Sequence, residues 1–153
     1  MPMELYVLSD VRSVSFEAWQ EAIYAGGFPL RLSLDGSCEV LSGAVRGLLR
    51  DRKTVFQCEP RDIRDVIADC PEAGFGQRWA HALAFRWGCN VHDGVAAYIA
   101  GAAYAGAAGG VVFDCVEGKV ISPERAGEIA REIERQIPLV EEAMRRVTEK
   151  FRA

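Results

Sequence analysis

The sequence predicts a single α+β domain over residues 1–153, with a largely antiparallel sheet, helices packed on it and a long amphipathic C-terminal helix. Short apolar segments with period-two alternation indicate strands, and turn residues join several of them directly, as in antiparallel sheets. Segments with apolar residues every three or four positions indicate helices. A content of 50% hydrophobic and 26% charged residues in 153 residues suits one globular domain with its own core.

The first half of the chain carries mostly strand patterns. They predict strands at residues 5–8, 30–34, 38–41 and 54–58. The pair Asp35-Gly36 is a hairpin signal between the second and third of these strands. Residues 42–53 combine glycines with mixed charges, so we expect an irregular or briefly helical segment there. Pro60 is expected to end the strand predicted over 54–58.

Two helices are predicted in the same half of the chain. Ser15 is an N-cap residue for a helix over 16–25, which a glycine pair ends. Asp62 is an N-cap residue for a short helix over 63–70, which Pro71 terminates.

Bulky and small residues alternate between 79 and 87, which predicts a strand with one large face and one alanine face. We expect the alanine face to lie against the Ala- and Gly-rich helix predicted over 92–108. Residues 94–113 form an uncharged stretch of 20 residues, but eight are Ala and five are Gly. Because these residues supply little transfer free energy, a buried helix is expected rather than a membrane span.

The C-terminal part begins with strands over 111–114 and 119–121, joined by a turn, and Ser122-Pro-Glu124 then starts a helix. The helix has an apolar stripe with steps of four and three: Ala126, Ala130, Ile133, Ile137, Val140, Met144, Val147 and Phe151. Pro138 interrupts it, so we expect a kink or two short helices in phase. Such a stripe packs on its own domain, or it binds a partner or forms a homodimer through the C-terminal helix.

Composition restricts the class of partner. A net charge of −4 and a pI near 5.3 argue against nucleic acid as a direct partner, since phosphate backbones require a basic face. The five cysteines are dispersed without a Cys-x-x-Cys pair, which indicates reduced thiols in the cytoplasm. The N-terminal segment lacks the basic and apolar regions of a secretion signal.

The strand-to-helix junction at 85–93 is the strongest candidate for a ligand site, because free amides gather where strand ends meet helix N-termini. It contains six chemically capable side chains: Arg86, Trp87, Cys89, Asn90, His92 and Asp93. A catalytic interpretation makes Cys89 a nucleophile with His92 as its base. A structural interpretation makes Asn90 or Asp93 the helix cap and assigns the remaining side chains to packing.

Metal and cofactor motifs are weak. A zinc site would draw on Cys89, His92, His81 and Cys115, but one Cys-x-x-His without a second pair does not predict it. His81 is instead expected to be a hydrogen-bonded core histidine. No phosphate-binding or dinucleotide-binding glycine motif is present, so no cofactor is expected.

Carboxylates cluster around the short helix over 63–70. Asp62, Asp65 and Asp69 have helical spacing and alternate with Arg61 and Arg64, which is typical of a solvated face or of an acidic docking surface. The full set of candidate partner-binding residues is Asp62, Asp65, Asp69, Glu72, Glu59 and Glu39.

Five short segments carry a resemblance to a known group: 16–19 (Phe-Glu-Ala-Trp), 27–30 (Gly-Phe-Pro-Leu), 85–88 (Phe-Arg-Trp-Gly), 109–114 (Gly-Gly-Val-Val-Phe-Asp) and 122–124 (Ser-Pro-Glu). Across nearly the whole chain the sequence resembles small bacterial proteins similar to the immunity proteins that accompany contact-delivered or type VI toxins. Cys89 departs from that pattern, which has a second glycine at this position.

The resemblance implies a non-enzymatic, cytoplasmic protein that neutralises a cognate toxin by blocking its active site. The partner would be a basic protein toxin, a nuclease included, against which acidic side chains dock. The alternative is a small enzyme or ligand-binding domain that uses the Arg86–Asp93 junction.

Overall fold

The computed structural model describes residues 3–33, 43–70, 75 and 79–152. The strands are β1 (Met3–Ser9), β2 (Leu30–Ser33), β3 (Gly43–Leu49), β4 (Arg52–Arg61), β5 (His81–Trp87), β6 (Val111–Asp114) and β7 (Lys119–Ile121). The helices are α1 (Phe16–Ala25), α2 (Ile63–Asp69), α3 (Val91–Ala108) and α4 (Pro123–Arg152). The predicted Asp35-Gly36 turn and the strand predicted over 38–41 lie outside the described residues.

The strands form one seven-stranded sheet in the order β2-β3-β4-β5-β1-β6-β7. Each recorded strand pairing is antiparallel. β1 therefore lies inside the sheet, between β5 and β6, although it comes first in the chain. The predicted α+β class with an antiparallel sheet is confirmed.

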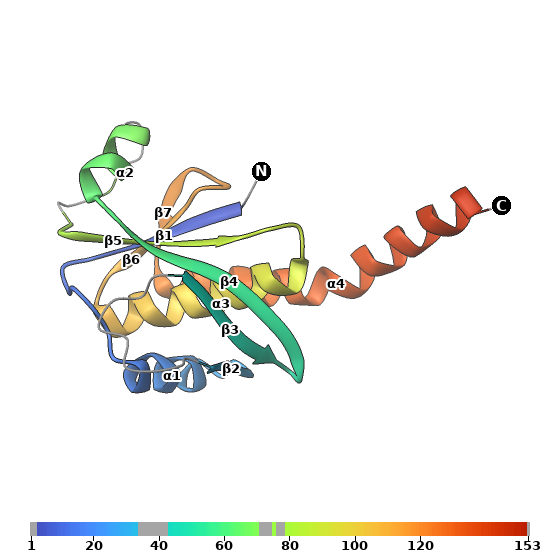
Figure 1. Ribbon diagram of the computed structural model, residues 1–153, viewed down its shortest axis with the longest axis horizontal. Coiled ribbons are helices and arrows are strands. Elements are labelled where there is room, and N and C mark those ends of the chain that lie inside the picture. The colour runs from blue at the N-terminus through green and yellow to red at the C-terminus, as the bar shows by residue number, and fades with distance from the viewer. Residues whose placement is uncertain (1–2, 34–42, 71–74, 76–78, 153) are drawn as a thin grey trace.

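The two faces of the sheet are covered unequally (Figure 1). Helices α1, α3 and the first half of α4 lie on one face, over a large core that includes Leu5, Trp19 and Phe85. The short helix α2 lies on the opposite face, where Val66 joins a smaller cluster with Tyr6. Much of this second face, along β2 to β4, is left exposed.

The predicted caps of the first two helices are confirmed. The Ser15 hydroxyl accepts a hydrogen bond from the amide of Ala18, and the Asp62 carboxylate accepts one from the amide of Arg64. Both caps satisfy amides that the first turn of a helix leaves without partners.

The prediction of an irregular or helical segment over 42–53 is wrong. Residues Gly43–Leu49 form β3, which pairs with β4 through a two-residue turn at Arg50 and Asp51. These two residues have φ of 48° and 69°, the left-handed values of the tight turn that matches strand twist. The strand prediction was also short at the other end, since β4 runs through Pro60 to Arg61 and pairs with β5 there.

The predicted position of the alanine face of β5 is also wrong. Leu83, Phe85 and Trp87, on the large face, pack in the core that contains α3. Ala82 and Ala84 instead belong to the cluster on the opposite face. The physical reason is complementarity of size: α3 is itself built from Ala and Gly, so large strand side chains fill the space beside it.

Helix α4 is continuous through Pro138, so the alternative of two short helices is wrong. Its first half packs on α3 and buries the predicted stripe as far as Ile137. Beyond this point the helix leaves the body and projects into solvent (Figure 1). The stripe expected to pack on its own domain therefore does so only over its first half. In the part of the chain that is described, no helix has the length and apolar character needed to cross a bilayer.

Candidate functional site

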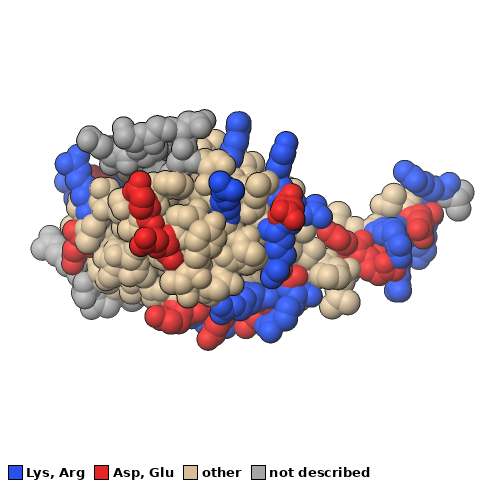
Figure 2. Space-filling model, turned by 90° about the horizontal axis from the view of Figure 1, so that it is seen from below, with Lys and Arg blue, Asp and Glu red and all other residues tan. Residues whose placement is uncertain are grey.

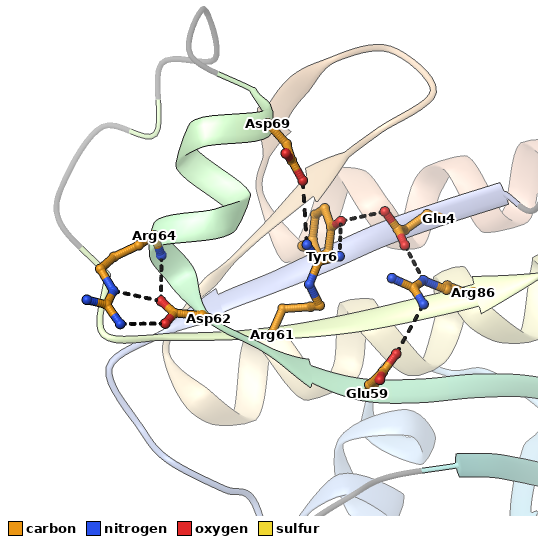
Figure 3. Close-up of polar contacts among 8 residues, drawn as sticks. All are labelled: Glu4, Tyr6, Glu59, Arg61, Asp62, Arg64, Asp69 and Arg86. Carbon is orange, nitrogen blue, oxygen red and sulfur yellow. Dashed lines mark hydrogen bonds and ion pairs between the residues drawn. The ribbon is translucent and has the colours of Figure 1, made fainter.

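Side chains from three neighbouring strands meet on the less covered face of the sheet (Figure 3). Arg86 on β5 is the register partner of Glu4 on β1, and its guanidinium donates to the carboxylate of Glu4. The same guanidinium donates to Glu59 Oε2 on β4 at 3.1 Å. One cation therefore holds two carboxylates from strands on either side of it.

Tyr6 and Arg61 extend this arrangement towards α2. The Tyr6 hydroxyl donates to Glu4 and accepts from Arg61 Nη1 at 3.2 Å, while Arg61 also lies 3.5 Å from Asp69 Oδ2. We call this set the sheet-face network: Glu4, Tyr6, Glu59, Arg61, Asp69 and Arg86. Burial, followed by the hydrogen bond to Glu4, raises the pKa of Tyr6. Tyr6 therefore stays a neutral donor near pH 7.

The alanine face of β5 explains how these long side chains converge. Ala84 is the register partner of both Tyr6 and Glu59. Its methyl group leaves room above the strand, so Tyr6 and Arg61 can lean across it. The sheet-face network was missed in the sequence because its members come from three strands and a helix, and their register is not readable locally. The available signal was polar alternation in β1, where Glu4 and Tyr6 share one face.

The candidate acidic residues lie in different environments. Asp62 and Arg64 form an ion pair of 2.7 Å, and the hydrogen bond from Arg64 lowers the pKa of Asp62 to about 2. Asp69 and Glu59 belong to the sheet-face network, whereas Asp65 is exposed on α2 without a recorded partner among the described residues. Three of these four carboxylates are thus paired with arginines. Glu39 and Glu72 lie outside the described residues.

The rest of that sheet face is basic. Arg31 on β2, Arg46 on β3 and Lys53 on β4 are exposed, and alternation places them on the face opposite the main core. A partner that covers the whole face would therefore meet charges of both signs.

Apart from Asn90, the junction residues are distributed over four places. Trp87 and Cys89 line a pocket between the junction and α4. Arg86 belongs to the sheet-face network, and Asp93 accepts a hydrogen bond from the amide of Val55 at 3.0 Å, at the free edge of β4. His92 Nε2 lies 3.2 Å from Glu141 Oε1 on α4.

No hydrogen bond joins Cys89 to His92, so the structure does not bring the two groups together as a catalytic dyad. Asn90 caps α3, as one of the sequence alternatives predicted, and its side chain accepts from the amides of His92 and Asp93. His81 is exposed at the start of β5, and its predicted place in the core is wrong. The described residues contain no group of three or more side chains of the types that ligate metals.

The pocket beside Trp87 and Cys89, which we call the junction pocket, has a volume of about 440 Å³. Its walls come from the start of α3, the turn between β6 and β7, and α4. Asp114, at the end of β6, lines it and is only 2% exposed. The sequence interpretation treated Asp114 as a strand end and did not single it out.

The projecting half of α4 is the third unusual feature. Met144 and Phe151 are 67% and 85% exposed, and Val140 and Val147 lie on the same stripe. In Figure 2 this half of the helix stands clear of the body, with acidic and basic side chains mixed along it. Glu142 forms ion pairs with Arg145 and Arg146 at helical spacing.

Fold and sites together define an α+β protein with a mixed-charge sheet face, a mainly apolar pocket that holds a buried carboxylate, and a projecting amphipathic helix. Comparisons of the chain with protein-family models, curated proteins and solved structures give no match.

Proposed function

We propose that this chain is a non-enzymatic protein-binding module that acts in the cytoplasm as an immunity protein against a protein toxin. The observation that carries the binding part of the proposal is the apolar stripe on the projecting half of α4. Val140, Met144, Val147 and Phe151 follow steps of four and three outside the body of the protein. Exposed apolar stripes of this kind are typical of helices that dock into a groove of another protein.

Other routes to a protein complex are less well supported. The edge strand β2 is covered on its outer side by Gln20, whose amide donates to the carbonyl of Leu30 and accepts from the amide of Leu32. A partner strand therefore cannot add at these positions without displacing Gln20.

A second copy of the chain is also a less favourable binding partner for the apolar stripe of α4. The projecting segment from Leu139 to Arg152 is about 21 Å long at 1.5 Å per residue. Two such segments offer a seam of only about four helical turns, which is short for the roughly 1,200 Å² at which stable interfaces begin. A different protein with a preformed groove can cover more of the helix, so we favour it over a homodimer.

The acidic residues around α2 offer a second surface for a basic toxin. Asp65, Asp69 and Glu59 are exposed there, and electrostatic attraction would speed encounter with a basic cleft. This surface lies at the opposite end of the molecule from the projecting half of α4 (Figure 1). Variants at each surface therefore separate the two modes of binding.

The test begins with capture of partners from the source cells, followed by expression of each captured protein in a bacterial host with and without this chain. A captured protein that arrests growth alone and is harmless with the chain supports the proposal. If every captured protein is harmless alone, or if toxicity persists with a stoichiometric amount of the chain, the immunity function is wrong.

Matched variants then locate the binding surface. Met144→Glu combined with Phe151→Glu should abolish protection, while Asp65→Asn combined with Asp69→Asn should leave it largely intact. The reverse result would assign binding to the acidic surface instead of α4. Both double variants change exposed side chains, so circular dichroism should show unchanged folding.

A further inference from the structure

The junction pocket has apolar walls that are held in place by packing. Trp87 and Tyr98 are buried and meet edge to face, with ring centroids 5.4 Å apart. Ile129 and Ile133 of α4 line the pocket as well. Gly94 gives Trp87 its position, since a Cβ at that residue would lie 2.8 Å from Trp87 Nε1. A volume of about 440 Å³ is within the range of small-molecule sites.

The polar feature of this pocket is the buried carboxylate of Asp114. Its Oδ1 accepts from Tyr98 Oη at 3.2 Å and from the amides of Val116 and Glu117 at 2.9 and 3.5 Å. None of the described residues donates a hydrogen bond to Oδ2. A carboxylate has about four acceptor positions, so Asp114 retains acceptor capacity beside the pocket.

The charges around the pocket favour a cation. Asp114 and Glu117 line it, and none of the described lining residues is Lys, Arg or His. Lys119 pairs with Glu117 at 3.1 Å, so Asp114 supplies the carboxylate without a cationic partner among the described residues. The N-terminus of α3 also borders the pocket, and its positive end alone would favour an anion. However, Asn90 already accepts from the amides of His92 and Asp93, and the full negative charge of Asp114 outweighs the partial charge that remains.

We propose that the junction pocket binds a small organic cation, with an ammonium or guanidinium group on Asp114 and an apolar portion between Trp87 and the isoleucines of α4. An apolar portion replaces water along these walls, and the aromatic rings also attract a cation. This ligand site goes beyond the proposed protein-binding function and does not rest on it, because the pocket is separate from the projecting half of α4.

The first test uses the unmodified protein and three probes of similar size and different charge. Binding of 2-phenylethylammonium, 2-phenylethanol and phenylacetate is measured by calorimetry and by Trp fluorescence. We expect the cation to bind about tenfold or more tightly than the neutral alcohol, because a charge-assisted hydrogen bond to a buried carboxylate is gained. Equal affinities, tighter binding of phenylacetate, or no binding of any probe would overturn the proposal.

Cys89 offers an independent test of where the ligand binds, because its side chain is exposed and lines the pocket. Its alkylation rate, followed by peptide mass spectrometry, should fall when 2-phenylethylammonium is bound. An unchanged rate at saturating probe would place the ligand elsewhere and contradict the assignment.

Asp114→Asn tests the carboxylate itself. Asparagine keeps an oxygen acceptor for Tyr98 and the turn amides but removes the charge, so the preference for the cation should disappear while the alcohol binds as before. Asp69→Asn removes an exposed carboxylate far from the pocket and should leave the preference unchanged. If Asp114→Asn does not fold, the three probes and the Cys89 rate still decide the question.

Discussion

Arg86 and Glu4 face one another as register partners on β5 and β1, and their side chains form an ion pair on the less covered face of the sheet. Arg86 also holds Glu59 on β4, so one guanidinium links the three central strands. Arg86 and Glu4 are 32% and 23% exposed, which places the pair between a surface salt bridge and a buried one. Its contribution to stability should therefore exceed that of the fully exposed pairs.

Replacement of Arg86 with methionine should destabilise the protein by about 1–2 kcal/mol, after allowance for solvent screening. The variant keeps the apolar stem but leaves Glu4 and Glu59 without their shared cation. Urea unfolding measures the change. Arg145→Met is the matched control, because Arg145 forms an exposed pair with Glu142 on the projecting half of α4 and should give a much smaller change. Equal effects of the two substitutions would contradict a special role for Arg86.

Asp62 should make the stability of α2 depend on acid pH. The hydrogen bond from Arg64 lowers the pKa of Asp62 to about 2 in the folded state, below the ordinary value of 3.8 for this group. A depressed carboxyl pKa stabilises the fold above pH 3.8, and this contribution is lost as the pH falls towards 2. NMR titration of the Asp62 carboxyl carbon should give a midpoint near 2.

Asp62→Asn provides the control for this pH dependence. Asparagine still caps α2 but loses the charge that pairs with Arg64, so the variant should be less stable than the wild type near pH 7 and converge with it towards pH 2. Between pH 4 and pH 2 it should lose less stability than the wild type, because position 62 no longer titrates. Identical acid unfolding curves would show that Asp62 does not contribute.

Elements with local signals were predicted correctly, and the elements decided by tertiary pairing were not. Ser15 and Asp62 cap their helices because a cap needs only its own first turn. The turn at Arg50 and Asp51 was missed because neither residue is glycine, and pairing of β3 with β4 imposes their positive φ values. The candidate site shows the same limit. The sequence singled out Arg86, but it could not show that Glu4 is its partner on the neighbouring strand.

The expected path of α4 shows a further limit of sequence periodicity. The stripe continues without interruption from Ala126 to Phe151, yet packing ends at Ile137. Periodicity reports that a helix has an apolar face, but the length of the body decides how much of that face is covered.

Deletion of residues 139–153 should therefore change the free energy of unfolding by less than about 0.5 kcal/mol. Beyond Pro138, Glu141 contacts His92 on the body of the protein, and both side chains are partly exposed. Ile137→Ala, by contrast, should cost about 2–3 kcal/mol because that side chain is buried. Urea unfolding of both variants checks the expectation, and a large loss on truncation would mean that the projecting half supports the fold.

Gly110 and Gly106 should respond in opposite ways to substitution by alanine. A Cβ at Gly110 would lie 2.1 Å from the carbonyl oxygen of Leu8, in the strand against which β6 pairs. Because that oxygen is backbone, β1 or β6 must shift, and Gly110→Ala should destabilise the protein by about 3 kcal/mol or prevent folding. A Cβ at Gly106 meets only Pro123 at 3.9 Å, so Gly106→Ala should stabilise α3 by about 0.5–1 kcal/mol. Thermal and urea unfolding compare the two variants, and a similar cost for both would show that β6 can move away from β1.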